Sequence, residues 1–306
     1  AIVITYNPPP GLPDRIRRIA AQADAVIIVD NGSEPDSRPE LLACASDTVS
    51  IAELGTNKGI AAALNFGITH AQQMGARYAW TFDHDSVPEP GCLDQLLATL
   101  SNPQFKDAFA TVPAIRYADP AIRCRWPSSE RSSALRPVCL LYADEMTGPT
   151  PVDLAIQSGM LLKVADHHAS GGFDETLFID LVDTDWCLRM RHHHGKRLIA
   201  TPGSQLQHSL GDVTRRTLPF FDKLVFPTRH SEIRHWFIAR NRILLWQRHC
   251  KNNPSWALYE LLGAIKLAGK VVCYEQNRKN KIKAMILGSA RGIRVALKSK
   301  TPPSGT

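Results

Sequence analysis

The sequence predicts an α/β fold in which a mixed, mainly parallel β-sheet is flanked by helices. Short apolar runs rich in β-branched residues recur along the chain, as in strands buried on both faces of a parallel sheet. The segments between them carry apolar residues at helical spacing. This alternation is typical of parallel sheets. With 306 residues, 44% of them hydrophobic, the chain can bury one large core and carry an appendage.

The alternation begins at the amino terminus. Strands are predicted at residues 1–5, 25–30 and 78–83, where continuous apolar runs end in polar, turn-forming residues. Helices are predicted at 12–23 and 57–75, because leucine, isoleucine and alanine recur there on one face. In such folds, ligands bind beyond the carboxyl ends of the strands. The polar residues at those ends are therefore expected to lie near one another.

The middle of the chain has weaker patterns. Residues 103–150 are expected to be irregular, with an exposed loop at the arginine- and serine-rich stretch 123–133. A further strand is predicted at 152–156. A helix is predicted at 185–194, with Asp183 or the following threonine as its amino-terminal cap.

Charge is distributed unevenly. The net charge is +7, but from Arg240 onward fourteen Lys and Arg residues face two acids, whereas the preceding residues carry twenty-two against twenty-seven. We expect an α/β domain at 1–230 and a basic, amphipathic helical extension at 231–306. Such an extension can lie on an anionic membrane surface. A solvated extension is the alternative, and binding to nucleic acid is disfavoured.

Composition excludes several classes. No apolar run reaches the roughly 18 residues of a membrane-spanning helix, and no secretory leader begins the chain, so a cytoplasmic location is expected. The seven cysteines are scattered, odd in number and never arranged as Cys-x-x-Cys, which argues against a disulfide framework and a thiolate zinc site. Because Ala1 adjoins a strand-like run, a few residues are expected to be missing upstream.

Two carboxylates follow the third predicted strand with one residue between them. Asp83-His84-Asp85 is a pattern that holds hard divalent cations such as Mg²⁺ or Mn²⁺, which often share their ligands with substrate phosphates. By itself the pattern also fits a polar turn that ends a buried strand. No glycine-rich loop of the dinucleotide-binding or P-loop type is present.

A different class of enzyme also uses this pattern. Asp83-His-Asp-Ser-Val87 fits the nucleophile motif of haloacid-dehalogenase-like phosphatases, with Asp83 as the nucleophile. That motif belongs on the first strand of its domain, however, and here two predicted strands precede it. A phosphohydrolase is therefore the alternative rather than the preferred interpretation.

The motifs of the chain resemble, in order and spacing, those of family 2 glycosyltransferases of the GT-A fold, a Rossmann-like nucleotide-diphospho-sugar transferase fold. The resemblance covers about residues 1–245, and its catalytic domain corresponds to 1–230. The chain looks most like bacterial rhamnosyltransferases of surface-polysaccharide (O-antigen or capsule) assembly. The motifs are Val3-Ile-Thr-Tyr-Asn7, Val29-Asp-Asn-Gly-Ser33, Gly55-Thr-Asn-Lys-Gly59, Phe82-Asp-His-Asp-Ser86, Gly171-Gly-Phe-Asp-Glu175 and Asp180-Leu-Val-Asp-Thr-Asp-Trp-Cys-Leu-Arg189.

The resemblance implies a binding site for the nucleotide of a sugar donor. Thr5 and Asn7 would lie against the nucleotide, and Asp30 would accept a hydrogen bond from the base. Asn57 and Gly59 would line the same pocket, where the absence of a side chain at Gly59 lets the donor approach closely. Taken singly, Asp30 also fits a turn and Asn57 a helix cap.

The resemblance also implies a metal site. Asp83 would contact the ribose or the metal, and Asp85 would ligate the Mg²⁺ or Mn²⁺ that bridges the diphosphate. His208, which follows a predicted strand, resembles the late histidine that completes metal coordination in some GT-A enzymes. A partly buried histidine without such a role is the alternative.

Asp183 is the candidate general base. In an inverting transfer the acceptor hydroxyl attacks the anomeric carbon in one step, and a carboxylate accepts its proton. Asp180 and Asp185 are rivals. The resemblance favours Asp183 because it occupies the place of the second residue of the family's Glu-Asp pair, although Val182 replaces the glutamate. Arg240 is a further candidate, for contact with the acceptor or diphosphate.

These observations predict an inverting, metal-dependent glycosyltransferase that moves L-rhamnose from dTDP-rhamnose to a lipid-linked saccharide. The protein would lie at the inner face of the plasma membrane. Transfer of another sugar, for example from a UDP-sugar, is the nearest alternative. A phosphohydrolase and a catalytically inactive sugar-nucleotide binder are the other two alternatives.

Overall fold

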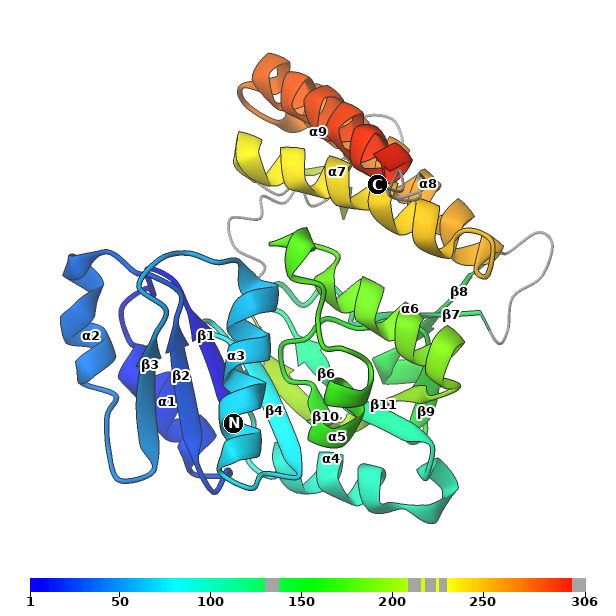
Figure 1. Cartoon of the computed structure of the whole chain (residues 1–306). Helices are drawn as coiled ribbons and strands as arrows, with labels where there is room; N and C mark the ends of the chain where they lie inside the picture. Colours follow the sequence, from blue (N-terminus) through cyan, green and yellow to red (C-terminus); the bar gives the residue numbers. More distant parts are fainter. Residues whose placement is uncertain (130–137, 209–215, 218–223, 226–229, 299–306) are drawn as a thin grey trace, which may run out of the picture. The chain divides into compact units, whose positions relative to one another are not determined.

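The computed structural model describes residues 1–129, 138–208, 216–217, 224–225 and 230–298 (Figure 1). Contacts divide these residues into two compact units. The first contains residues 1–129, 139–178 and 182–208, and the second contains the remainder. The three helices of the carboxyl-terminal part and the short segment 179–181 thus belong to the second unit. The division at residue 230 expected from the sequence stays a prediction.

Nine strands of the first unit form one mixed sheet. They are β1 (Ile2–Thr5), β2 (Val26–Asp30), β3 (Val49–Glu53), β4 (Tyr78–Asp83), β5 (Val87–Pro88), β6 (Ala108–Arg116), β9 (Thr150–Val152), β10 (Leu161–Lys163) and β11 (Arg197–Gln207). The order is β3-β2-β1-β4-β10-β6-β11-β5, and β9 pairs with β11. β3, β2, β1 and β4 are parallel, β6 is parallel to β11, and β10 runs antiparallel between β4 and β6. A separate hairpin joins β7 (Arg125–Ser128) to β8 (Cys139–Tyr142).

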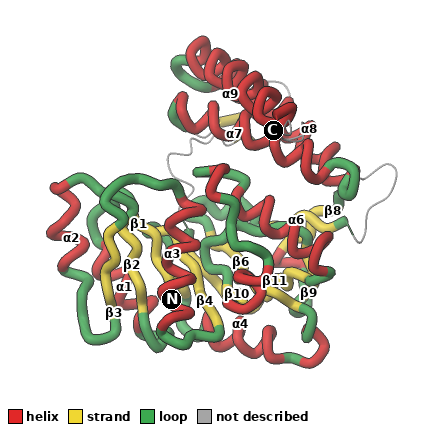
Figure 2. Tube along the Cα trace, in the orientation of Figure 1, coloured by secondary structure: helices red, strands yellow, loops and turns green. Residues whose placement is uncertain are grey.

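Helices cover the sheet of the first unit (Figure 2). They are α1 (Leu12–Ala20), α2 (Arg38–Leu42), α3 (Ile60–Gln73), α4 (Cys92–Ser101), α5 (Val164–Ala169) and α6 (Val182–His194), with 3-10 turns at Pro35–Ser37, Pro103–Phe105, Ala143–Glu145 and Glu175–Leu177. α1 and α4 share one apolar cluster with Val3 and Ile28. α3 packs on the opposite face, where Gly67 approaches Ile2 and Val29. Because neighbouring strand residues face opposite sides, both faces of the sheet are buried.

The expected elements of the amino-terminal part are confirmed, with ends that differ by a few residues. The expectation that 103–150 is irregular is wrong, because β6, β7 and β8 lie within it. The exposed loop expected at 123–133 is also wrong over β7, which has two buried side chains, and residues 130–133 lie outside the described part of the chain. Pro113 interrupts the apolar pattern of β6, and proline is uncommon inside central strands. Here it pairs with Thr201, after which the register shifts so that Ala114 pairs with Gln205. The irregularity of β11 therefore falls where β6 lacks an N–H donor.

Three further expectations need correction. β3 was not expected, and its half-exposed pattern explains why an apolar-run criterion misses it. The strand predicted at 152–156 lies earlier, at β9, because residues 153–156 leave the sheet. α6 begins at Val182, so Asp183 lies in its first turn rather than at the cap.

The described second unit is mainly helical. Its elements are α7 (Glu232–His249), α8 (Pro254–Tyr274) and α9 (Arg278–Lys298), with a short pair formed by β12 (Arg216–Thr217) and β13 (Leu224–Val225). α9 packs closely on α7 through two glycines: a Cβ on Gly288 would lie 2.2 Å from the carbonyl oxygen of Trp236, and one on Gly292 would lie 2.7 Å from that of Arg240. Among the described helices, none combines the length and apolar character needed to cross a membrane.

Candidate functional site

Three parallel strands end at one edge of the sheet. In the β1–β2 ladder Thr5 pairs with Asp30, and in the β1–β4 ladder Ile4 pairs with Asp83. The polar residues that follow these strands are therefore brought to the same edge, as the sequence predicts. This edge is where parallel α/β sheets bind their ligands.

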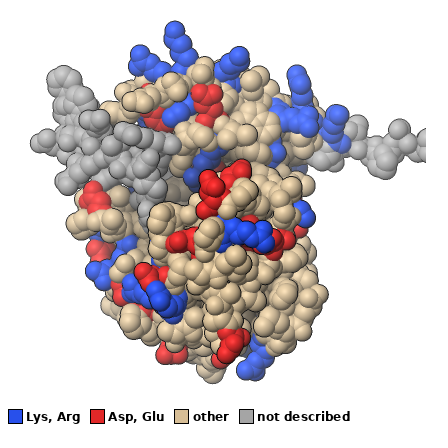
Figure 3. Space-filling view, turned by 90° about the vertical axis from the view of Figure 1, so that its left-hand side faces the viewer, with Lys and Arg blue, Asp and Glu red and all other residues tan. Residues whose placement is uncertain are grey.

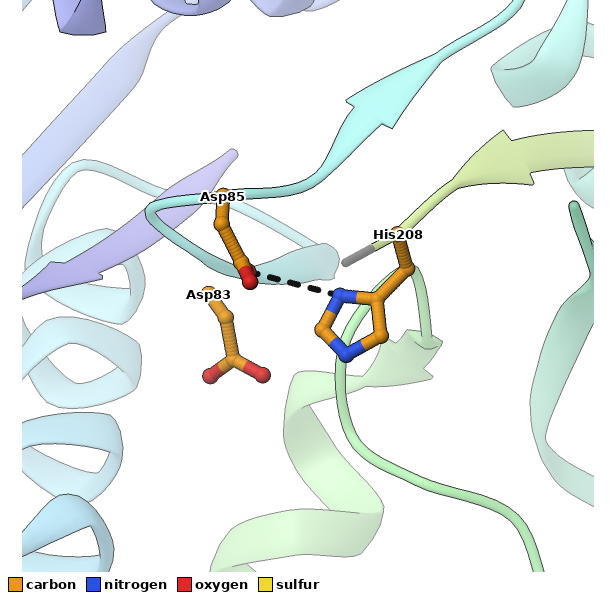
Figure 4. A group of neighbouring side chains, drawn as sticks. All are labelled: Asp83, Asp85 and His208. Carbon is orange, nitrogen blue, oxygen red and sulfur yellow. Dashed lines mark ion pairs between the residues drawn. The ribbon is translucent and has the colours of Figure 1, made fainter. Parts of the chain in front are cut away.

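A candidate metal site lies beyond β4. Asp83 ends β4, Asp85 lies in the turn before β5, and His208 follows β11 (Figure 4). β5 pairs with the end of β11, Val87 opposite Gln207, and this pairing brings His208 to the turn. One ligand atom from each of the three residues lies within 4.8 Å of the other two. The two carboxylates and the histidine singled out in the sequence thus come together.

Buried polar side chains hold Asp83 and His208 in place. Gln157 donates from Nε2 to Asp83 Oδ1 at 2.6 Å. Ser158 accepts from the Asp83 backbone N–H at 3.1 Å and lies 2.6 Å from Ser86 Oγ, which lies 2.7 Å from His208 Nδ1. The supporting roles of these three residues were not predicted. The only sequence signal was the position of Gln157 and Ser158 between two apolar runs.

The electrostatics of the cluster favour a bound cation. Burial alone would raise the pKa of Asp85, but the nearby His208, His84 and backbone N–H together outweigh this effect and leave the pKa lowered. Burial lowers the pKa of His208, yet Asp85 and Asp83 together raise it. Asp85 Oδ1 is buried and accepts no hydrogen bond from the described residues, although it lies 3.4 Å from His208 Nδ1. Two carboxylates and an imidazole suit a divalent ion such as Mn²⁺ or Mg²⁺, so the residues fit the expected metal.

The carboxylate of Asp30 is held within its own turn. It is 6% exposed, and it accepts hydrogen bonds from Thr5 Oγ1 at 3.2 Å, from Ser33 N at 3.1 Å and from Ser33 Oγ. Ser33 Oγ also accepts from Asn7 N at 2.8 Å, which joins the loops after β1 and β2. Asp30 is the last residue of β2, and its bonds to Ser33 hold the turn that follows the strand. Its contact with a nucleotide base stays a prediction, as do the contacts of Thr5 and Asn7.

Asn57 and Gly59 shape the start of α3. Asn57 Oδ1 accepts from Gly59 N at 3.0 Å and from Asn31 Nδ2 at 3.2 Å. Gly59 has a φ of 87°, and a Cβ there would lie 2.6 Å from the carbonyl oxygen of Phe178. The need for glycine at this position therefore comes from its backbone angle and from Phe178. Contact of either residue with the donor stays a prediction.

The three candidate bases have different surroundings. Asp185 is fully buried and accepts from Arg189 Nε at 2.8 Å, while Arg189 also donates to two backbone carbonyls. Asp180, in the second unit, forms a two-point contact with Arg234. Asp183 is half-buried in the first turn of α6, where its Oδ1 accepts from Thr184 N at 2.7 Å. The arginine contacts disfavour Asp180 and Asp185 as proton acceptors.

The last candidate site residue is Arg240. Arg240 lies on α7 with its guanidinium 5.3 Å from the ring centre of Trp236 and 4.8 Å from that of Phe237. It donates to Asn241 Oδ1. These are contacts within the second unit. Contact of Arg240 with acceptor or diphosphate stays a prediction.

Comparisons with solved structures identify the class of fold. The chain superposes on GalNAc-T7, solved with UDP, GalNAc and Mn²⁺, with a TM-score of 0.54 and 11% identity over 68% of this chain and 43% of that one. It superposes on residues 1–349 of TarS from S. aureus with a TM-score of 0.50 and 10% identity, over 98% of this chain and 72% of that one. The fold is therefore that of the GT-A glycosyltransferases, with carboxyl-terminal helices in addition.

Sequence comparisons define the protein more closely. Residues 1–148 match the model of the family described as glycosyl transferase family 2. The chain is 27% identical to the dTDP-rhamnosyl transferase RfbF of Shigella flexneri over 298 residues, which cover 96% of this chain and 95% of that protein. Residues 1–148 carry a glycosyl transferase family 2 domain, and the protein is a glycosyltransferase.

The competing phosphatase interpretation loses support. In the described sheet three strands, rather than the two expected, precede Asp83 along the chain. The nucleophile of the phosphatase class belongs on the first strand. The position of Asp83 therefore disfavours a nucleophilic role.

Proposed function

We propose that this glycosyltransferase is inverting and metal-dependent, and that it transfers L-rhamnose from dTDP-rhamnose to a lipid-linked saccharide during bacterial surface-polysaccharide synthesis. The observation that carries the choice of sugar is the similarity to RfbF, which extends over nearly the whole length of both chains. Similarity confined to the catalytic fold would support only glycosyl transfer in general.

Asp83, Asp85 and His208 are the residues that would hold the metal. A bound Mn²⁺ or Mg²⁺ supplies positive charge to the departing nucleoside diphosphate. Gln157 orients the Asp83 carboxylate, and Ser86 orients the His208 ring, so two of the three proposed ligands would be arranged before the donor arrives. A histidine ligand binds metal in its neutral form, so binding should displace the proton that Asp85 favours on His208.

The nucleotide would lie along the edge formed by the ends of β1 and β2. Thr5, Ser33 and Asn7 hold the Asp30 turn in one geometry, which supports the proposed contact between Asp30 and the base N–H. Asn57 shapes the neighbouring turn before α3. A carboxylate fixed in advance loses little conformational freedom on binding.

Asp183 would accept the proton of the acceptor hydroxyl. Its place in the first turn of α6 supports this role, because the positive end of the helix dipole keeps a carboxylate ionised. A single displacement with a base on the acceptor side inverts the anomeric configuration. Asp185 and Asp180 are poorer candidates for the general base, because each forms an ion pair with an arginine, Arg189 and Arg234 respectively.

The second unit would attach the enzyme to the inner face of the plasma membrane. Lys and Arg side chains project from its surface (Figure 3). Large apolar side chains are exposed on the same helices: Leu258, Leu261, Leu262, Ile265 and Val272 on α8, and Ile286, Leu287, Ile293 and Leu297 on α9. Basic and apolar side chains together favour the surface of an anionic bilayer, and each Lys or Arg near it contributes about 1 kcal/mol. No role in nucleic-acid binding is proposed.

A screen of nucleotide sugars tests the proposed function. We expect dTDP-rhamnose with Mn²⁺ to raise the melting temperature of the protein more than UDP- or GDP-sugars do, because a ligand of the native state stabilises it by mass action. Release of dTDP with acceptor present should then follow. A stronger response to a UDP-sugar would show that the donor is a UDP-sugar rather than dTDP-rhamnose. Donor binding without sugar transfer would indicate a catalytically inactive binder. A phosphoaspartate trapped at Asp83 by BeF₃⁻ would indicate a phosphohydrolase.

A further inference from the structure

The chain that leads into α6 has an unusual backbone. Phe178, Asp180 and Leu181 have positive φ angles of 65°, 62° and 63°. Residues other than glycine rarely adopt this conformation, and each costs about 1–2 kcal/mol relative to the right-handed region. No glycine lies between Phe178 and Val182, where α6 begins. Other interactions must therefore hold this segment in its strained form.

α7 supplies two of those interactions through one side chain. Asn241 is fully buried, and its Nδ2 donates to the carbonyl oxygens of Ile179 at 2.8 Å and Asp180 at 2.9 Å. Its Oδ1 accepts from the Arg240 guanidinium at 2.7 and 2.9 Å. Arginine can only donate, so this contact fixes which end of the amide faces the carbonyls. One amide group thereby holds two consecutive peptide units.

Arg234 lies two turns earlier on α7 and holds the side chain of Asp180, which belongs to the same segment. Its Nη2 lies 2.9 Å from Asp180 Oδ1, and its Nε lies 3.1 Å from Asp180 Oδ2. A two-point contact fixes the orientation of the carboxylate as well as its charge. Asp180 is thus held by both its carbonyl oxygen and its carboxylate.

We propose that Asn241 is a positioning residue for the candidate base Asp183, with Arg234 in support. Only Leu181 and Val182 separate Asp180 from Asp183, so a change in backbone direction at Asp180 reaches the first turn of α6. Displacement of a catalytic group by about 1 Å can lower a rate by roughly 10². This inference rests on the proposed role of Asp183. It explains why the rival Asp180 carries a carboxylate without acting as the base.

Asn241→Asp tests the role of the amide donors. Aspartate has the same shape and retains an acceptor for Arg240, but it cannot donate to the two carbonyls. We expect the turnover of each donor-binding molecule to fall about tenfold or more, while donor affinity stays within about threefold. Turnover is normalised to the stoichiometry of donor binding in calorimetry, so loss of folded protein alone does not lower it.

Gln247→Glu is a matched control. Gln247 lies on the same helix, and its Nε2 donates to the backbone carbonyl oxygen of Ala296 at 2.8 Å. The chemical change is the same, but the bond is made to α9 rather than to the 179–181 segment. We expect a lower melting temperature and unchanged normalised turnover. An equal fall in turnover in both variants would show a general effect of stability and would overturn the proposal.

Arg234→Gln keeps the proposal testable if Asn241→Asp does not fold. The Arg234 side chain is 42% exposed, so its replacement should leave the unit folded. We expect a smaller fall in normalised turnover with donor affinity unchanged. Wild-type turnover in whichever variant folds would overturn this inference, whereas a wild-type enzyme that transfers no sugar would overturn the proposed function and this inference with it.

Discussion

Asp85→Asn is the sharpest test of the metal site. The substitution preserves the shape of the side chain but removes the charge of one of the three candidate ligands, whose atoms lie within 4.8 Å of one another. Two unit charges about 4 Å apart at an effective dielectric constant of about 20 interact by roughly 4 kcal/mol. The Asp85 side chain is 27% exposed, so solvent weakens this interaction.

We therefore expect a loss of about 2 kcal/mol in Mn²⁺-dependent donor binding, which corresponds to roughly 30-fold in affinity at 1.4 kcal/mol per tenfold. Titration calorimetry with dTDP-rhamnose, with and without Mn²⁺, measures it. Asp47→Asn is a suitable control because Asp47 is exposed and lies before β3. Mn²⁺-dependent affinity equal to wild type in Asp85→Asn would refute the assignment of Asp85 as a ligand.

Other expected outcomes concern the base, the second unit and the membrane. Asp183→Asn should keep donor affinity within a few-fold and lower turnover by roughly 10² or more, since an amide cannot accept the proton; near-normal transfer in steady-state assays would reject the base. Gly288→Ala should lower the melting temperature because its Cβ would lie 2.2 Å from a carbonyl oxygen, whereas Gly263→Ala, with no atom within 4 Å, should stabilise α8 by up to about 1 kcal/mol. Equal melting temperatures would contradict the packing of α9 on α7. Ile265→Asp should reduce the fraction of protein that sediments with anionic vesicles, because it places a charge on the proposed membrane surface. Leu42→Asp is the control and should not reduce it, although both side chains are exposed, at 62% and 56%. Vesicle binding unchanged by Ile265→Asp would argue against this membrane surface.

Local patterns in the sequence predicted much of the fold and the two carboxylates of the candidate metal site. The apolar runs that became β1, β2 and β4 are buried throughout or nearly so, and such runs are recognisable without knowledge of their neighbours. A parallel sheet then brings their carboxyl ends to one edge, which is why Asp30 and Asp83 could be predicted to lie near each other. His208 was found only through the resemblance to a family, because a lone histidine carries no local signal of metal binding.

Other features depended on contacts between residues far apart in the chain. β6 was missed because Pro113 breaks its pattern, and the compensating irregularity lies in β11, almost ninety residues later. The arginine partners of two of the three candidate aspartates, Arg189 at Asp185 and Arg234 at Asp180, were likewise not predicted, although such partners bear on the role of a carboxylate.

The sequence by itself determined the class of fold, the identity of the metal-ligand candidates and the basic character of the carboxyl-terminal part. Most of these properties follow from the order and spacing of neighbouring residues, whereas His208 became a candidate through the resemblance to a family. Only the tertiary structure decided what holds the site together: the buried serines that orient Asp83 and His208, and the Asn241 amide that holds a segment sixty residues earlier. The physical reason is that a buried hydrogen bond depends on atoms meeting in space, and local sequence does not specify which distant residue will supply the partner.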